Sequence, residues 1–127
     1  MDKKILIVDD DIHIQQLLNQ FLKNEGWVIH VSGDGAAAIG KISKYKYDLI
    51  ILDINMPGIN GFKTLSIIRE NEATKDIPVL MLTMSKNMDD VVKARALRIT
   101  DYIIKPPTKE QLIKRVRRAM GTENPQT

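Results

Sequence analysis

The chain has 127 residues, of which 43% are hydrophobic and 28% charged, with a formal net charge of +3 and no cysteine. This composition is typical of one globular domain, and it excludes disulfides, thiolate metal sites and an apolar run long enough to span a membrane. Because a short charged start leads directly into a strand, without a signal peptide, we expect a cytoplasmic protein. Aromatic residues make up only 5%, so direct nucleic-acid binding is disfavoured.

Short apolar runs alternate with amphipathic segments along the whole chain. Residues 14, 17, 18, 21 and 22 are apolar and share one helical face, which predicts a helix capped by Asp10 or Asp11 and stopped by Gly26. In the fourth helix, Val91 and Val92 are expected to point inward. In chain order, the predicted elements are strand 4–8, helix 11–25, strand 27–31, helix 36–44, strand 48–52, helix 62–71, strand 79–82, helix 87–97, strand 101–104 and a helix from the cap Thr108 to residue 120.

Five strands alternating with five helices predict a doubly wound α/β fold. The strands are short, continuous apolar runs, as in a parallel sheet that is covered on both faces. We therefore expect one domain over residues 1–120. Residues 121–127 are polar and contain a proline, which indicates a frayed tail or the start of a linker.

Reactive polar residues follow four of the predicted strands. Asp9 and Asp10 follow the first strand, Asp53 the third, Thr83 the fourth and Lys105 the fifth. Ligands of open α/β sheets bind outside the carboxyl ends of the strands, so these side chains are expected at one edge of the sheet. Each residue alone has an ordinary explanation as a cap, a turn former or a solvated group. Four such coincidences at one edge favour a functional site.

Three neighbouring carboxylates need a cation. At an effective dielectric constant of about 20, one like-charged pair at ~4 Å costs roughly 4 kcal/mol. Oxygen ligands without cysteine favour Mg²⁺, with Mn²⁺ as the alternative, over zinc. A carboxylate that the metal leaves free can act as a nucleophile and accept a phosphoryl group. Lys105 and the hydroxyl of Thr83 would then bind phosphoryl oxygens.

At this point the sequence resembles a receiver domain of the response regulators of two-component signalling, similar to the chemotaxis regulators. The resemblance covers residues 4–120. The residues that carry it are Ile5-Leu6-Ile7-Val8-Asp9-Asp10, Leu52-Asp53-Ile54-Asn55-Met56-Pro57-Gly58, Gly61, Thr83 and Asp101-Tyr102-Ile103-Ile104-Lys105-Pro106.

The resemblance implies a flavodoxin-like sheet of strand order 2-1-3-4-5 and a role for each matching residue. Asp53 would be the phosphoacceptor, and Thr83 and Lys105 would bind the phosphoryl group. The metal would be held by Asp9, Asp10, Asp53 and the backbone carbonyl of Asn55. Tyr102 would turn inward when Thr83 moves toward the phosphate. The Lys105–Pro106 bond would be cis.

The resemblance also implies partners. The donor would be a histidine kinase or a His-containing phosphotransfer protein, and the domain would be a signalling phosphoacceptor with slow self-dephosphorylation, not an enzyme acting on other substrates. The effector would bind the surface of the last two helices and the last strand. We expect this surface to meet an acidic partner through its basic residues, Arg95, Arg98, Lys109, Arg115 and Arg118.

Four positions depart from the family pattern. Arg98 and Ile99 replace a usual Gly-Ala pair, so the turn before the last strand is expected to be unusual. Met84 replaces a small residue after Thr83, and a large side chain there would screen a phosphoryl group from water. Pro107 replaces a common phenylalanine.

The sequence also fits two rival interpretations. Residues Gly33-x-Gly35-x-x-Ala38 fit a dinucleotide-binding turn, with Asp53 where a ribose-binding acid would fall, but this leaves the other polar residues without a role. A Mg²⁺-dependent phosphatase with an aspartyl-phosphate intermediate needs nearly the same groups. It would need a proton-transferring acid where this chain has Asn55, which favours a domain that keeps its phosphate.

Overall fold

The computed structural model describes residues 2–122, and its sheet has five parallel strands in the order β2-β1-β3-β4-β5. The expected doubly wound fold is confirmed. Most of the predicted tail, residues 123–127, lies outside the described part. The strands are β1 (Lys4–Val8), β2 (Val28–Ser32), β3 (Leu49–Leu52), β4 (Val79–Thr83) and β5 (Asp101–Ile104). The helices are α1 (Ile12–Leu22), the 3₁₀ helix η1 (Lys23–Glu25), α2 (Gly35–Lys44), α3 (Gly61–Glu70), α4 (Met88–Ala96) and α5 (Lys109–Ala119).

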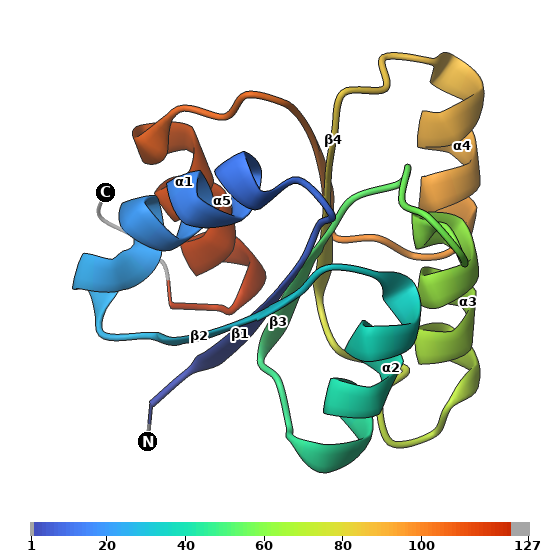
Figure 1. Ribbon diagram of the computed structural model, residues 1–127, viewed down its shortest axis with the longest axis horizontal. Helices are drawn as coiled ribbons and strands as arrows, with labels where there is room; N and C mark the ends of the chain where they lie inside the picture. Colours follow the sequence, from blue (N-terminus) through green and yellow to red (C-terminus); the bar gives the residue numbers. More distant parts are fainter. Residues whose placement is uncertain (1, 123–127) are drawn as a thin grey trace.

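The sheet is the middle of three layers, with α1 and α5 on one face and α2, α3 and α4 on the other (Figure 1). Alternate residues of each central strand enter opposite cores, because successive side chains of a strand point to opposite faces. Ile5 and Ile7 of β1 pack in the core that includes Leu18 of α1, whereas Leu6 and Val8 pack with residues of α2 and α3. Every residue of β3 and β4 is buried, which explains their uninterrupted apolar sequences.

The helix boundaries follow local capping chemistry. Asp11 and Thr108 accept hydrogen bonds from the first-turn amides of α1 and α5, which confirms both predicted caps. The first predicted helix is split, since α1 ends at Leu22 and a short 3₁₀ turn leads to Gly26. Gly26 has a φ of 82°, the left-handed conformation that stops a helix at little cost for glycine.

The prediction that Val92 points inward is wrong, because its side chain is 60% exposed. In α4 only Ala94 is fully buried, and Val91 is half-buried. Residues 91 and 94 are three apart and share one helical face, whereas Val92, the residue after Val91, lies on the side of the helix that faces solvent. Strand β2 also begins and ends one residue later than predicted.

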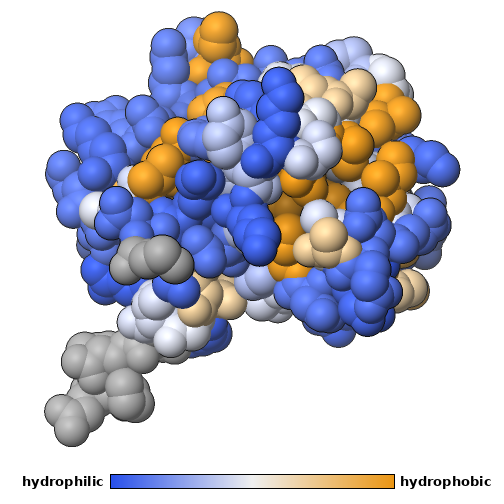
Figure 2. Space-filling model, turned by 90° about the horizontal axis from the view of Figure 1, so that it is seen from below, coloured by the Kyte–Doolittle hydropathy of each residue, from blue (hydrophilic) through white to orange (hydrophobic). Residues whose placement is uncertain are grey.

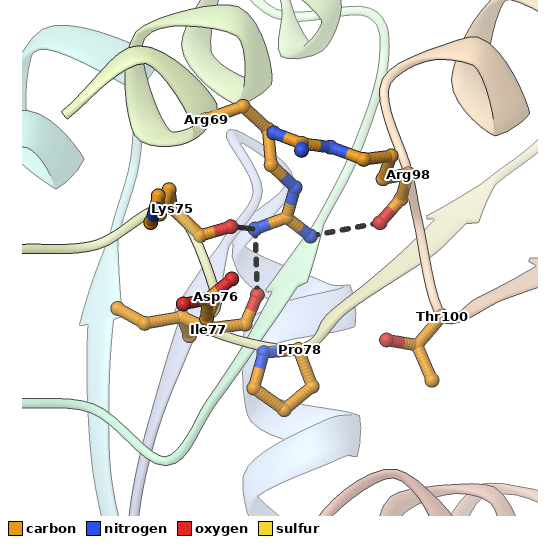
Figure 3. A pocket seen from close by; sticks show the side chains of 7 residues that line it. All are labelled: Arg69, Lys75, Asp76, Ile77, Pro78, Arg98 and Thr100. Carbon is orange, nitrogen blue, oxygen red and sulfur yellow. Dashed lines mark hydrogen bonds between the residues drawn. The ribbon is translucent and has the colours of Figure 1, made fainter. Parts of the chain in front are cut away.

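The turn before β5 is unusual, as expected from Arg98. This residue has a φ of 62°, where glycine would be unstrained. Arg69 of α3 holds the turn, since its guanidinium donates hydrogen bonds to the carbonyl oxygens of Leu97 at 3.1 Å and Arg98 at 2.9 Å. It also reaches the carbonyl oxygens of Lys75 and Ile77 from the preceding loop (Figure 3). The guanidinium therefore ties the loops before β4 and β5 together.

Arg69 also lines a pocket of about 210 Å³ at the amino ends of β4 and β5, opposite the edge that carries Asp53. Burial lowers the pKa of Arg69 below its usual value, and the nearby positive charge of Arg98 acts in the same direction. With its N–H groups donated to backbone oxygens, Arg69 has a structural role.

The surface carries separate apolar areas on a mainly hydrophilic background (Figure 2). A second pocket, of about 280 Å³, lies between α2 and α3 and is lined in part by Ile39, Ile42 and Ile67. Among residues 2–122, no helix is both long enough and apolar enough to cross a membrane.

Candidate functional site

The predicted polar residues meet where β1 and β3 end side by side. Val8 and Leu52 are paired in the parallel register, so Asp9 and Asp53 both follow the last residue of a central strand. The Asp53 amide donates to the carbonyl oxygen of Val8 at 3.0 Å, so the hydrogen bonding between β1 and β3 continues just beyond the strand ends. Since β2 and β3 lie on opposite sides of β1, the connections that follow β1 and β3 lead to opposite faces of the sheet. A ligand site is expected at the carboxyl ends of two such strands.

Lys105 joins the carboxylates of Asp9 and Asp53. Its Nζ lies 2.7 Å from Oδ2 of Asp9 and 2.9 Å from Oδ2 of Asp53. The three side chains are at most 8% exposed, so the ammonium group is the buried counter-charge of both acids. Lys105 thus lies in direct contact with Asp53, and its predicted binding of phosphoryl oxygens stays a prediction.

The ionisation of this group reflects burial and pairing. Burial raises the pKa of the Asp9 carboxyl above its usual value, and the hydrogen bond from Lys105 acts in the opposite direction. Burial acts to lower the pKa of Lys105, but the hydrogen bonds to Asp9 and Asp53 outweigh it, so this pKa lies above its usual value. Lys105 therefore remains charged at neutral pH.

The other carboxylate oxygens are held by backbone amides. Oδ1 of Asp53 accepts from the amide of Ile54 at 2.7 Å, and Oδ1 of Asp9 accepts from the amide of Asp11 at 2.9 Å. Asp10 is exposed, and carboxylate oxygens of Asp9, Asp10 and Asp53 lie within 4.8 Å of one another. These oxygens form an acidic cluster that fits a hard divalent cation such as Mg²⁺.

Gly61 allows the chain after Asp53 to pack closely. A Cβ at this position would lie 2.1 Å from the backbone oxygen of Asp53 and 2.8 Å from Cα of Ile54. The Gly61 amide donates to the carbonyl oxygen of Ile54 at 2.7 Å, so α3 begins directly against the Asp53 turn. Asn55, the predicted source of a backbone ligand, lies in this turn and is exposed.

Thr83 and Tyr102 are connected through the loop that follows β4. Thr83 is fully buried, and its Oγ1 accepts from the Ser85 amide at 3.3 Å. The hydroxyl of Tyr102 donates to the carbonyl oxygen of Ser85 at 2.9 Å. Burial raises the pKa of Tyr102 above its usual value. Tyr102 is thus half-buried and bonded to this loop, and its movement in response to phosphate stays a prediction.

Sequence reasoning did not identify Ser85 or Asp90 as part of this connection. Oγ of Ser85 donates to Oδ2 of Asp90 at 2.6 Å, which fixes the loop to the first turn of α4. The signal was present, since a serine three residues before a helix and an acid in its first turn are typical helix-start residues. Their contact with the Thr83 and Tyr102 positions depends on how β4 and β5 pair.

Comparisons with known proteins agree with this geometry. The family model for the response regulator receiver domain matches residues 5–117. The chain belongs to this family. It is 36% identical over 117 residues to the DNA-binding response regulator MtrA of Mycobacterium tuberculosis, covering 92% of this chain and 50% of that protein. It is 38% identical over 117 residues to the regulatory protein VanRc of Enterococcus gallinarum, covering 92% of this chain and 49% of that protein.

Solved structures give the same result. The chemotaxis protein CheY4 of Vibrio cholerae superposes with a TM-score of 0.89 at 33% identity, covering 94% of this chain and 99% of that one. The chain spans about half the length of the curated relatives it matches and nearly all of the chemotaxis protein. It is a receiver domain of two-component response regulators.

The receiver fold also explains the glycine motif of the dinucleotide interpretation. Gly33 and Gly35 follow the edge strand β2, not the strand at the turning point of the sheet. A Cβ on Gly35 would lie 2.3 Å from Oγ1 of Thr64 and 2.6 Å from Cγ1 of Ile59. Glycine at position 35 therefore allows α2 to pack against α3, and no nucleotide is needed to explain it.

Proposed function

We propose that Asp53 is the phosphoacceptor of this receiver domain, with a histidine kinase or a His-containing phosphotransfer protein as the donor. The observation that carries the proposal is the buried contact of Lys105 with both Asp9 and Asp53, beside the exposed carboxylate of Asp10. We place this reaction in the cytoplasm, with no direct contact between this domain and nucleic acid or membrane.

In the proposed reaction, a carboxylate oxygen of Asp53 forms a bond to phosphorus while the bond from phosphorus to the donor nitrogen breaks. The donor histidine keeps the electron pair of that bond. Asp9, Asp10 and the Asn55 carbonyl, together with Asp53, would hold Mg²⁺, or Mn²⁺ in its place, which neutralises phosphoryl charge when bound. Lys105 already lies at Asp53 and would bind a phosphoryl oxygen, while Thr83 would donate its hydroxyl to another.

The test is intact-mass analysis after incubation with acetyl phosphate and Mg²⁺. We expect one labile phosphoryl adduct on the wild type and none on Asp53→Ala or on the wild type with the metal chelated. An adduct of equal yield on Asp53→Ala would move the acceptor to another residue. A wild type that hydrolyses excess phosphate ester with rapid multiple turnover would instead favour the phosphatase interpretation.

We further propose that an effector binds the surface of α4, β5 and α5. This surface is basic, but part of its charge is paired within the domain: Nη1 of Arg115 lies 2.7 and 2.6 Å from the two carboxylate oxygens of Asp101. The exposed Arg95 and Lys109 are better placed to meet an acidic partner.

Phosphorylation is expected to change this surface more than the opposite one. In amide NMR spectra recorded before and after phosphorylation, we expect the largest shifts outside the Asp53 turn in α4 and β5. Amides of α2 serve as the internal reference, since this helix follows the edge strand β2, which lies at the opposite end of the sheet from β5. Shifts of equal size in α2 and α4 would remove the proposed output surface.

Met84 is expected to slow the loss of phosphate. It follows Thr83 directly, after the carboxyl end of β4, and its side chain is 74% exposed. A long apolar side chain there reduces the access of water to a phosphoryl group on Asp53. We expect Met84→Ala to raise the self-dephosphorylation rate several-fold, measured by decay of the adduct after the donor is removed. Met88→Ala, which truncates another exposed methionine, is the control; an unchanged or slower rate in Met84→Ala would contradict the screening role.

A further inference from the structure

Ser85 uses all of its polar groups to join three parts of the domain. Its amide donates to Oγ1 of Thr83 at 3.3 Å, and its carbonyl oxygen accepts from the hydroxyl of Tyr102 at 2.9 Å. Its own hydroxyl donates to Oδ2 of Asp90 at 2.6 Å and accepts from the amide of Asn87 at 3.3 Å. One residue therefore contacts the end of β4, the strand β5 and the start of α4.

The side chain of Ser85 links these backbone contacts to α4. The amide and the carbonyl group of Ser85 link Thr83 to Tyr102 through a single residue. A shift of the Thr83 side chain would therefore move the carbonyl oxygen that the Tyr102 hydroxyl contacts. The hydroxyl adds the link to α4, and its bond to a carboxylate is of the stronger, charge-assisted kind. Ser85 and Asp90 are both half-buried, which limits competition from water.

Asp90, which accepts the hydrogen bond from the Ser85 hydroxyl, is held in the capped first turn of α4. Asp90 lies in the first turn of α4, where a negative charge interacts favourably with the helix dipole. Asn87 caps the same helix, and its side chain accepts from the amide of Asp89 at 2.8 Å. Since the hydroxyl of Ser85 contacts both Asp90 and Asn87, a displacement of the loop is transmitted to the first turn of α4.

We propose that Ser85 is a positioning residue whose hydroxyl, held by Asp90, couples Thr83 and Tyr102 to α4. The inference rests on the proposed phosphorylation of Asp53 and adds the means by which that event reaches the α4 surface. Coupling of this kind is reciprocal. When the Ser85 hydroxyl holds the loop in place, the loop orients both the side chain of Thr83 and the side chain of Tyr102. Without the hydroxyl, the Tyr102 contact and the start of α4 become independent of each other.

The experiment follows Tyr102 directly, by ¹⁹F NMR of the full chain labelled with 3-fluorotyrosine. Tyr102→Phe assigns the signal, and intact mass records the adduct on Asp53 in each sample. Ser85→Ala and Asp90→Ala each remove one side of the contact. Ser85→Thr keeps a hydroxyl at the same position, and Asp89→Ala removes an adjacent, exposed carboxylate from the same helix turn. Acetyl phosphate with Mg²⁺ is the phosphorylating probe.

In Ser85→Ala and Asp90→Ala, we expect the Tyr102 signal to move toward that of an exposed tyrosine, and its change on phosphorylation to fall by at least half. Ser85→Thr and Asp89→Ala should resemble the wild type. A wild-type Tyr102 signal and response in Ser85→Ala would overturn the inference, as would a Ser85→Thr variant that behaves like Ser85→Ala. These outcomes differ from failure of the proposed function, which would appear as a missing adduct on the wild type.

Discussion

Replacing Lys105 with methionine is expected to lower the free energy of unfolding by about 3 kcal/mol in buffer without divalent cations. The ammonium group is the buried partner of Asp9 and Asp53, at 2.7 and 2.9 Å. Removing it leaves two neighbouring carboxylates whose other hydrogen bonds, within residues 2–122, come from the backbone amides of Asp11 and Ile54. Methionine keeps most of the side-chain length, so the loss reports mainly on charge. Urea unfolding of both proteins, followed by circular dichroism, measures the difference.

Mg²⁺ should recover part of this loss, because a cation at the acidic cluster replaces the missing positive charge. Binding to the folded state alone stabilises by about 2.7 kcal/mol when the free ion is at 100 times its dissociation constant. The control is Lys109→Met, which removes an exposed lysine at the start of α5 and should change stability little. A Lys105→Met protein as stable as the wild type without metal would show that the buried carboxylates do not depend on Lys105.

Replacing Asp10 with asparagine is expected to have the opposite effect on the metal-free protein. Its carboxylate lies within 4.8 Å of those of Asp9 and Asp53, so neutralising it removes two repulsive pairs. Since Asp10 is exposed and screened by water, we expect a gain of about 1 to 2 kcal/mol. The same change removes a proposed metal ligand, so the stabilisation by Mg²⁺ should be reduced or lost. Thermal unfolding with and without Mg²⁺ measures both effects.

Asp89→Asn is the matched control for Asp10→Asn, since it makes the same charge change at an exposed position in α4. It should bring no gain in stability and leave the response to Mg²⁺ intact. An Asp10→Asn variant that is less stable than the wild type, or that responds to Mg²⁺ as strongly, would show that Asp10 is not part of a strained metal-binding cluster. A gain in stability at the expense of binding is the pattern expected where a functional site concentrates like charges.

Much of the fold could be predicted because its signals are local. Continuous apolar runs at β1, β3 and β4 reflect strands buried on both faces, and the caps Asp11 and Thr108 act within one helical turn. Prediction was wrong where the pattern is weak. Val92 lies in a short helix that buries only Ala94 fully, so the outward orientation of its side chain could not be predicted from hydrophobicity alone.

For the site, the amino-acid sequence shows which chemical groups are present: carboxylates at 9, 10 and 53, a hydroxyl at 83 and an ammonium group at 105, each after a predicted strand. Parallel pairing makes such strand ends neighbours, so their convergence followed from the strand pattern. Which of these groups are in contact depends on how the chain packs in three dimensions. Lys105 contacts Asp9 and Asp53, and Ser85 joins Thr83 to Tyr102, through side-chain directions and loop positions that depend on residues far apart in the chain. Hydrogen bonds act over about 3 Å, a precision that helix and strand periodicity does not encode.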